Sequence, residues 1–453
     1  MTIDSSDLIE DEVAPDGPRA VDIFDPRRRA DPYPTYRALL AAGRFHWLYP
    51  QSPRIALVTR YADCQRVLQD PSVGHVSMAD SAFRVDTEVD EGLRSMLRAN
   101  APTHTRLRRL VSRGFTAGRI ARFGPLAREL AAELLDDALR GETPDGGAAG
   151  GDPAGHRTGA AVSHGAAGGA VADGGAVDLV GAFARPLPLR VICTLLGVPP
   201  RDEVVFGDWA SALTRALDPD QLLSPTERAQ RTEATVGFHD YFTELIAQRR
   251  VAPADDLLSD LIAVSDQGDR LSGPELLDLC VLLLVAGYET TVNLIANTVL
   301  ALARDPSQYA LLRSRRELVP AALEETLRFD PQIQYVGRTV LADVDLGGET
   351  LRAGDGVIAL LAGAQRDPEV FAQPDRFDVT RYAGAASAPR HFGFGLGIHY
   401  CLGAPLARLE AEIMLTALLD RVAHIEIAVE PPPYRPHLGV RGVSALPVHL
   451  TPA

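Results

Sequence analysis

The residues with the clearest capacity for chemistry surround Cys401, in the run FGLGIHYCLG at residues 394–403. The residues that follow, 404–412, read as the start of a helix with a proline in its first turn, where proline is tolerated. Cys401 would then face the unpaired N–H groups and the positive end of that helix, and both favour a thiolate over a thiol. Gly395 and Gly397 can adopt backbone angles that other residues avoid, so the chain can fold tightly beneath a planar ligand of the sulfur.

The second candidate site lies in the best helical stretch of the chain, which runs from Ser272 to about Ala303. The stretch opens with Ser-Gly-Pro-Glu, which matches a capping box. At 1.5 Å per residue its roughly 30 residues would extend for about 45 Å, which is enough to cross a whole domain.

Inside this stretch, the sequence AGYET at residues 286–290 stands out because it contains a glycine. Gly287 costs about 1 kcal/mol relative to alanine in a helix interior, so its presence invites a reason. Ala286 and Gly287 leave room beside the helix for a diatomic ligand, and Thr290 can donate a hydrogen bond back to the Ala286 carbonyl. The alternative is close packing against another helix, which requires small residues for the same reason.

Two further pairs of residues have helical spacing. Glu325 and Arg328 stand three residues apart, which puts a carboxylate and a guanidinium on one helical face. His104 and Arg108 lie within about 40° of each other around a helix that turns about 100° per residue. The opposite side of the same helix carries a cluster of arginines, namely Arg106, Arg109 and Arg113.

These segments resemble the cytochrome P-450 family, whose motifs are F-G-x-G-x-H-x-C-x-G in the haem loop, A-G-x-[DE]-T in the oxygen-activating helix, and E-x-x-R. All three occur in family order, which favours a liganding Cys401 over a small buried hydrophobe, the commoner fate of a free cysteine. The resemblance covers residues 21–453 apart from one insertion. It implies a mainly α fold with small β-sheets, built as a single haem domain with a long central helix.

The resemblance assigns roles around the haem. It implies that Cys401 is the axial ligand of the iron of haem b. It makes Glu289 and Thr290 the catalytic pair that relays protons during oxygen activation. Four residues match family positions that serve the haem propionates: His104, Arg108, Arg338 and His399.

The resemblance also assigns structural and substrate positions. A buried charge network beside the cysteine would consist of Glu325, Arg328 and Arg376, the last from the run FAQPDRF at residues 371–377. The substrate pocket would be lined by Leu282, Ala286, Gln334 and Val440, with the loops around 82–95 and 204–222. This wall is mostly apolar with one amide, which predicts a medium or large hydrophobic substrate.

The function implied is a haem-thiolate monooxygenase that inserts one oxygen atom from O₂ into an apolar natural product, by hydroxylation or epoxidation, in bacterial secondary metabolism. One alternative on the same fold is oxidative C–C or C–O coupling of aromatic groups. A haem sensor or redox protein is the non-enzymatic alternative, against which the intact acid–alcohol pair at residues 289–290 argues.

Electrons are expected from NAD(P)H through a ferredoxin reductase and a small iron–sulfur ferredoxin, since the chain carries no fused flavin or nicotinamide domain. The cluster of Arg106, Arg109 and Arg113 stands out against an acidic protein, which favours docking of an acidic electron donor there. The alternative is an ordinary solvated basic helix.

The composition of the 453-residue chain excludes several classes of protein. Its net charge of -15 and pI near 5.2 argue against a nucleic-acid-binding protein. Its four cysteines are far apart and form no Cys-x-x-Cys pair, so neither a disulfide scaffold nor a zinc ribbon is expected. The acidic start has no signal-peptide pattern, and the longest strongly apolar run, residues 279–287, is far shorter than the ~20 residues that span a bilayer. We expect a cytoplasmic protein without membrane contact, and a monomer.

The chain is expected to form one haem domain at residues 21–453 after a disordered acidic tail at residues 1–20. Residues 141–176 interrupt the domain, and 22 of these 36 residues are Gly or Ala, with few side chains large enough to pack. This composition predicts a flexible surface insertion, since loop length costs little free energy. The alternative is a tether that docks a partner.

Overall fold

The computed structural model describes residues 19–51, 53–77, 80–83, 96–141, 175–215, 223–263, 265–266, 269–384 and 388–453. The expected acidic tail lies outside these residues except for Arg19 and Ala20, and the Gly/Ala-rich insertion lies outside them except for residues 141, 175 and 176. The first core side chains are Ala20 and Ile23, close to where the sequence predicts that packing begins.

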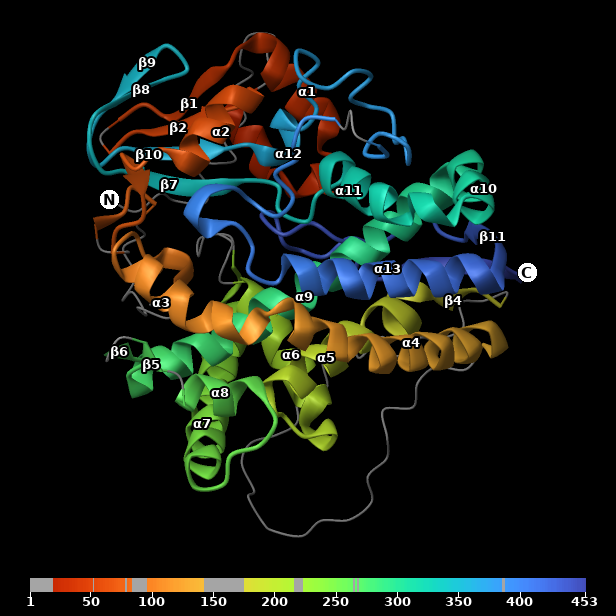
Figure 1. Ribbon diagram of the computed structural model, residues 1–453. Coiled ribbons are helices and arrows are strands. Elements are labelled where there is room, and N and C mark those ends of the chain that lie inside the picture. The colour runs from red at the N-terminus through yellow and green to blue at the C-terminus, as the bar shows by residue number, and fades with distance from the viewer. Residues whose placement is uncertain are drawn as a thin grey trace.

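Helices make up most of the described chain (Figure 1). They are α1 (Tyr33–Ala42), α2 (Tyr61–Gln69), α3 (Thr103–Ser112), α4 (Ala117–Arg140), α5 (Pro186–Leu196), α6 (Glu203–Thr214), α7 (Pro225–Val251), α8 (Leu257–Ala263), α9 (Gly273–Arg304), α10 (Pro306–Ser314), α11 (Val319–Phe329), α12 (Leu361–Ala364) and α13 (Ala404–Arg421). The strands are β1 (Phe45–Tyr49), β2 (Ile55–Val58), β3 (Val73–Gly74), β4 (Val177–Asp178), β5 (Ser265–Asp266), β6 (Asp269–Arg270), β7 (Val336–Val340), β8 (Val344–Leu346), β9 (Glu349–Leu351), β10 (Gly356–Ala359), β11 (Val422–Ile427) and β12 (Pro447–Pro452). The predicted mainly α fold with small sheets is confirmed.

Helix α9 runs through the middle of the protein, and α5, α6, α11 and α13 all pack against it (Figure 1). The predicted capping box opens it: Ser272 Oγ accepts a hydrogen bond from the Glu275 N–H, and the Glu275 carboxylate accepts one from the Ser272 N–H. Among the described helices, α9 alone is long and apolar enough to cross a membrane, but 83% of its most apolar window is buried inside the protein. Burial in the core therefore accounts for its composition.

The largest sheet lies to one side of the helices, at the upper left of Figure 1. Its five strands have the order β1-β2-β10-β7-β3, and only the β2–β10 pair is parallel. The sheet has its own buried apolar residues, including Ala56, Val58, Val357 and Ala359. Pairing of β7 with β10 fixes the backbone of Arg338 opposite Val357.

A buried ion pair on α11 holds the loops that follow the sheet. Arg328 is fully buried, and its Nε and Nη2 atoms each donate a 2.8 Å hydrogen bond to the carboxylate of Glu325. Its remaining N–H groups donate to the backbone carbonyls of Gln365, Pro374 and Arg376. Because every donor has a partner, the guanidinium can stay in a dry environment and fasten this segment to α11.

The third charged member of this network is Arg381, so the expectation for Arg376 is wrong. Arg381 Nε lies 3.0 Å from the Glu325 carboxylate, and the Arg381 side chain is only 11% exposed. The Arg376 side chain is exposed and donates to the Gln373 side chain, while its backbone carbonyl alone joins the network. Phe377 occupies the inward position beside it, which turns the Arg376 side chain outward.

We expect Arg381→Ala to lower the free energy of unfolding by about 3 kcal/mol, because it breaks a buried ion pair from one side. Arg376→Ala is the matched control and should change that free energy by less than about 0.5 kcal/mol, because it removes an exposed side chain. Urea unfolding followed by far-ultraviolet circular dichroism measures both. Equal decreases in the free energy of unfolding of the two variants would show that the Arg376 side chain also belongs to the network.

Candidate active site

The Cys401 loop turns on two glycines. Gly395 and Gly397 both have a φ of 69°, in the left-handed region that glycine adopts without strain. A Cβ atom on Gly397 would lie 2.5 Å from the carbonyl oxygen of Leu68, so the end of α2 leaves no room for a larger residue. The Cys401 N–H donates a 2.9 Å hydrogen bond to the Phe394 carbonyl, and α13 begins shortly afterwards. The loop and the helix start are therefore formed as the sequence predicts.

Glu324 on α11 fastens both ends of this loop. Its carboxylate accepts hydrogen bonds from Arg408 on α13, at 2.6 and 2.8 Å, and from Nε2 of His391 just before the loop, at 2.7 Å. Burial acts to raise the pKa of Glu324, but the bonds from Arg408 and His391 hold it down to about 2. The Arg408 guanidinium also lies 4.5 Å from the centre of the Phe394 ring. Nothing in the sequence pattern distinguished Glu324 from its neighbour Glu325.

Burial raises the pKa of the Cys401 thiol, and this effect outweighs the lowering by the N–H groups of Gly403 and Ala404 and by the charges of Arg108 and Arg408. The helix end thus acts on the sulfur in the predicted direction, although burial opposes it. A cation bound directly to the sulfur supplies the missing stabilisation, as iron does in a haem.

One face of α9 carries two solvent-accessible residues and one buried residue. Leu282, Ala286 and Thr290 follow one another at four-residue intervals and therefore share a face. Ala286 is exposed and Thr290 half-buried, in a helix whose central residues are mostly buried. Thr290 Oγ1 donates a 2.6 Å hydrogen bond to the Ala286 carbonyl, as the sequence predicts. This stripe therefore presents an accessible small side chain and a half-buried hydroxyl on one face of the helix.

The neighbouring glycine serves the alternative role considered for this motif. A Cβ atom on Gly287 would lie 3.0 Å from Cδ1 of Ile192, so Gly287 permits close packing between α9 and α5. Ala286 and Gly287 therefore have different reasons to be small, one on the accessible stripe and the other facing a helix.

Two arginines and two imidazoles form a cation cluster at one edge of the site. The rings of His104 and His399 lie 4.4 Å apart, and Arg108 acts electrostatically on both. Burial and the charge of Arg338 lower the pKa of His399 to about 3, and burial lowers the pKa of Arg338 to about 10. Nδ1 of His104 is buried without a hydrogen-bond partner in the described part of the chain. The structure thus brings the four predicted propionate residues together, and such a cluster fits a ligand with two carboxylates.

The donor set around the sulfur points to the same ligand. In the described ranges, no group of three or more His, Cys, Asp or Glu side chains could hold a metal ion. A metal bound to Cys401 therefore needs a group that supplies its other ligands, and a porphyrin does so. The thiol, the accessible stripe on α9 and the cation cluster together fit haem.

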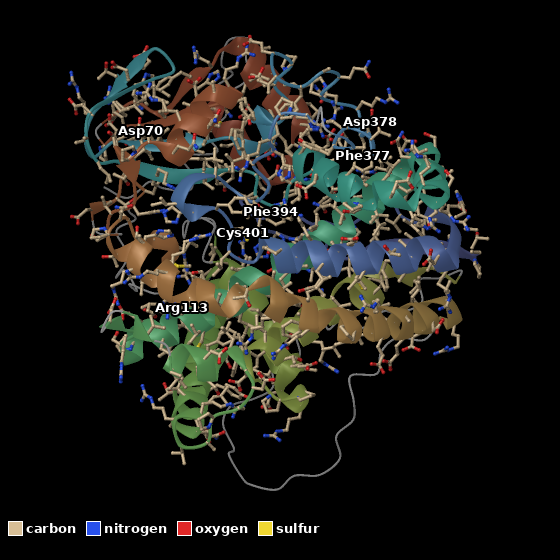
Figure 2. All side chains as sticks on the ribbon, in the orientation of Figure 1. Asp70, Arg113, Phe377, Asp378, Phe394 and Cys401 are labelled. Atoms are coloured by element: carbon tan, nitrogen blue, oxygen red, sulfur yellow. The ribbon has the colours of Figure 1, made fainter. Side chains whose placement is uncertain are left out.

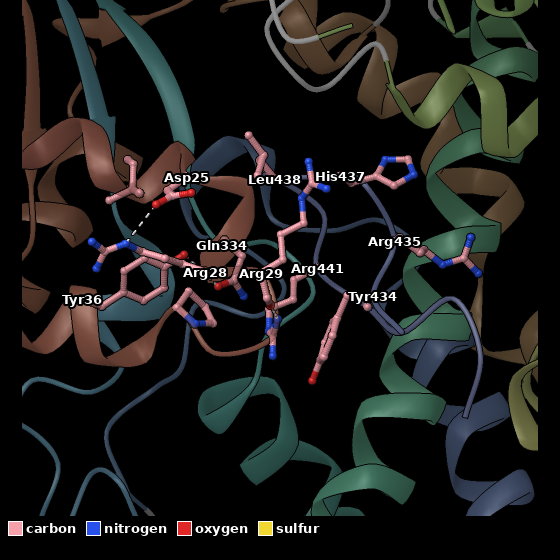
Figure 3. A pocket seen from close by; sticks show the side chains of 13 residues that line it. Asp25, Arg28, Arg29, Tyr36, Gln334, Tyr434, Arg435, His437, Leu438 and Arg441 are labelled. Atoms are coloured by element: carbon pink, nitrogen blue, oxygen red, sulfur yellow. Dashed lines mark hydrogen bonds and ion pairs between the residues drawn. The ribbon is translucent and has the colours of Figure 1, made fainter. Parts of the chain in front are cut away.

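Glu289 is 1% exposed and forms a buried ion pair that the sequence did not indicate. Arg435 Nη1 lies 2.7 Å from its carboxylate, and His437 Nε2 lies 3.6 Å from it. Both partners come from the segment between β11 and β12 and line a polar cavity of about 20 Å³ (Figure 3). This cavity has room for about one water molecule and is also lined by Arg28 and Arg441. A polar connection therefore runs from Glu289 towards the C-terminal segment.

The predicted pocket residues differ in what they can offer a substrate. Gln334 is buried with its amide already engaged: Oε1 accepts a hydrogen bond from the Tyr36 hydroxyl at 3.1 Å, and Nε2 donates to a backbone carbonyl at 2.6 Å. Val440 is buried as well. The predicted loop segments 84–95 and 216–222 lie outside the described residues. The predicted pocket residues therefore present an apolar surface to a substrate, because the Gln334 amide is already hydrogen-bonded within the protein.

The predicted basic face is partly used inside the protein. Arg106 pairs with Asp269 at 3.1 Å and with Glu275 at the start of α9, and Arg109 lies 4.0 Å from Asp269. Arg113 is exposed at the end of α3 (Figure 2). Arg106 therefore joins α3 to α9 by ion pairs, and docking of an acidic donor on this face stays a prediction.

These features fit a haem protein with Cys401 as the candidate iron ligand, and comparisons with known proteins give a haem-containing family. The family model described as Cytochrome P450 matches residues 209–442. Cytochrome P450 monooxygenase PikC of Streptomyces venezuelae is 38% identical over 92% of this chain and 91% of the relative. Mycinamicin IV hydroxylase/epoxidase of Micromonospora griseorubida is 38% identical over 93% of this chain and 98% of the relative.

A solved structure agrees with these sequence matches. Ligand-free CYP164A2 of Mycobacterium smegmatis superposes with a TM-score of 0.78 at 37% identity, covering 94% of this chain and 98% of that chain. The chain belongs to the cytochrome P450 family. It is an oxidoreductase of the monooxygenase type, and its cofactor is haem.

The hydrogen bonds that Glu324 accepts from Arg408 and His391 predict that the stability of the fold depends on pH. Because its pKa is depressed in the folded protein, Glu324 stabilises the fold fully above its unfolded value near 4.5 and loses that contribution as the pH falls towards about 2. Glu324→Gln should therefore cost about 3 kcal/mol at pH 7. About 1 kcal/mol of this difference should disappear by pH 4, as measured by urea unfolding at each pH. If the difference in free energy of unfolding between wild type and Glu324→Gln stays constant between pH 7 and pH 4, Glu324 does not make this contribution.

Proposed function

We propose that this enzyme inserts one oxygen atom from O₂ into an apolar natural product, by hydroxylation or epoxidation, as part of bacterial secondary metabolism. The observation that carries the proposal is the stripe of Leu282, Ala286 and Thr290, in which an accessible small side chain and one hydroxyl share a face of a mostly buried helix. The printed names of the two curated relatives, a monooxygenase and a hydroxylase/epoxidase, support oxygen insertion.

Five side chains of this protein would hold the haem. Cys401 would hold the iron, and His104, Arg108, Arg338 and His399 would hold the propionates. Bound haem supplies the redox chemistry that cleaves O₂, favoured by the electron-rich sulfur.

Proton delivery is the task of Thr290 and Glu289. Thr290 Oγ1 keeps its hydroxyl aligned by donating to the Ala286 carbonyl, which leaves its oxygen lone pairs to hold a water or accept a proton. Glu289 is buried in its pair with Arg435 and His437, so it reaches Thr290 by leaving that pair or through water. The small cavity lined by Arg435 and His437 has room for about one water molecule on the far side of this ion pair from α9 and is lined by neither Glu289 nor Thr290.

Electrons would come from NAD(P)H through a separate ferredoxin reductase and ferredoxin. The exposed Arg113 at the end of α3 supports docking of an acidic donor on this side. With Arg106 committed to α9, this docking surface is smaller than the sequence alone indicates.

The test of the proposed function starts with a screen of apolar natural products, mycinamicin IV among them, for the shift of the haem from low spin to high spin. Compounds that bind are then incubated with the enzyme, NADPH, ferredoxin and ferredoxin reductase, and the masses of the products are measured by mass spectrometry. A gain of one oxygen atom supports the proposal, whereas a loss of two hydrogens indicates oxidative coupling. A CO complex of the reduced protein without the red-shifted Soret band would contradict thiolate ligation.

We expect Thr290→Ala to lower the product formed per NAD(P)H consumed by about tenfold or more, because the proton relay loses its hydroxyl. Thr290→Ser should retain most of this coupling. Thr291→Ala is the matched control, since the Thr291 hydroxyl makes the same type of bond, 3.0 Å to the Gly287 carbonyl, from a buried position. If Thr290→Ala forms as much product per NAD(P)H consumed as the wild type, Thr290 does not take part in proton delivery.

A further inference from the structure

His75 stands at the edge of the cation cluster and has no role in the site described so far. It follows β3, whose Gly74 pairs with Thr339 of β7, so the antiparallel register brings His75 alongside Arg338. The ring of His75 meets the ring of His399 edge-on, with 5.3 Å between centroids. His75 thus extends the cluster of His104, His399 and Arg338 by one more imidazole.

The backbone of His75 is held in place by one side chain. Asn100 Oδ1 accepts a 2.9 Å hydrogen bond from the His75 N–H, and Asn100 Nδ2 donates a 2.6 Å bond to the His75 carbonyl. A Cβ atom on Gly74 would lie 2.6 Å from Asn100 Oδ1, so glycine is what lets the amide approach. An amide is also required at residue 100, because a carboxylate cannot donate the second bond. The position of the imidazole is therefore built into the fold.

The imidazole itself lacks a partner. Nε2 of His75 is buried and has no hydrogen-bond partner among the described residues. Burial, followed by the charges of Arg338, His399, Arg98 and His104, lowers the pKa of His75 to about 3. Arg338 and Arg98 are cations, and His399 and His104 contribute imidazole rings, so the unpartnered Nε2 of His75 lies beside positive charge and other potential donors. An unpaired buried polar group costs about 1 to 3 kcal/mol, and an anionic ligand would remove this cost.

We propose that His75 is a further binding residue for haem, with Nε2–H donating a hydrogen bond to a propionate carboxylate. This inference rests on the haem assignment made above. His75 stands with the cations that surround the propionates and apart from the Cys401 loop and the α9 stripe, so it acts on retention of haem and not on the reaction at the iron.

The test is the rate at which the holoenzyme gives up haem to an excess of a haem-free globin acceptor. His75→Ala should release haem on the order of tenfold faster than the wild type, because a charge-assisted hydrogen bond is lost. His75→Gln keeps an N–H donor and should stay within about threefold of the wild type. His424→Ala removes a histidine exposed on β11 and is the matched control, with no change expected.

A second readout separates this role from damage to the fold or to the iron site. The Soret band of the CO-bound ferrous form should be the same in all variants, because Cys401 is untouched. Asn100→Asp, which keeps the bond to the His75 N–H and loses the bond to its carbonyl, should release haem faster than the wild type.

Two outcomes would overturn the inference: haem release from His75→Ala within twofold of the wild-type rate, or equal acceleration in His75→Ala and His75→Gln, which would indicate packing alone. Failure of the wild-type protein to bind haem would refute the cofactor assignment instead.

Discussion

The site depends on two consecutive carboxylates, Glu324 and Glu325, on helix α11. Side chains of successive residues lie about 100° apart around a helix, so Glu324 and Glu325 contact different segments of the protein. Glu325 is fully buried and holds Arg328 and Arg381, which fasten the loops after the sheet. Glu324 holds both ends of the Cys401 loop. Because unpaired charges in such surroundings would be costly, the loops have little freedom to rearrange.

Local features of the site could be predicted from the sequence. The turn at Gly395 and Gly397 and the capping box at Ser272 each depend on residues close together in the chain. The bond from Thr290 to the Ala286 carbonyl follows from helical geometry alone. The mainly α fold was predicted from the resemblance to the cytochrome P450 family, and the long helix that begins at Ser272 was also visible in the sequence itself.

Features that depend on distant segments were predicted wrongly or missed. Arg376 and Arg381 stand in one irregular loop, and without periodicity the sequence gives no means of deciding which arginine turns inward. The ion pair of Glu289 with Arg435 joins a central helix to the C-terminal segment, and no local pattern marks it. Burial of the Cys401 thiol, which the sequence does not measure, opposes the predicted effect of the helix end on its pKa.

The contact between α3 and α9 has a mechanical consequence. Glu275 uses its carboxylate both to close the capping box with Ser272 and to hold Arg106 of α3. One side chain thus connects the start of the central helix to the helix that carries His104 and Arg108. The residues expected at the haem propionates and the hydroxyl of Thr290 are therefore carried by two helices that an ion pair joins directly.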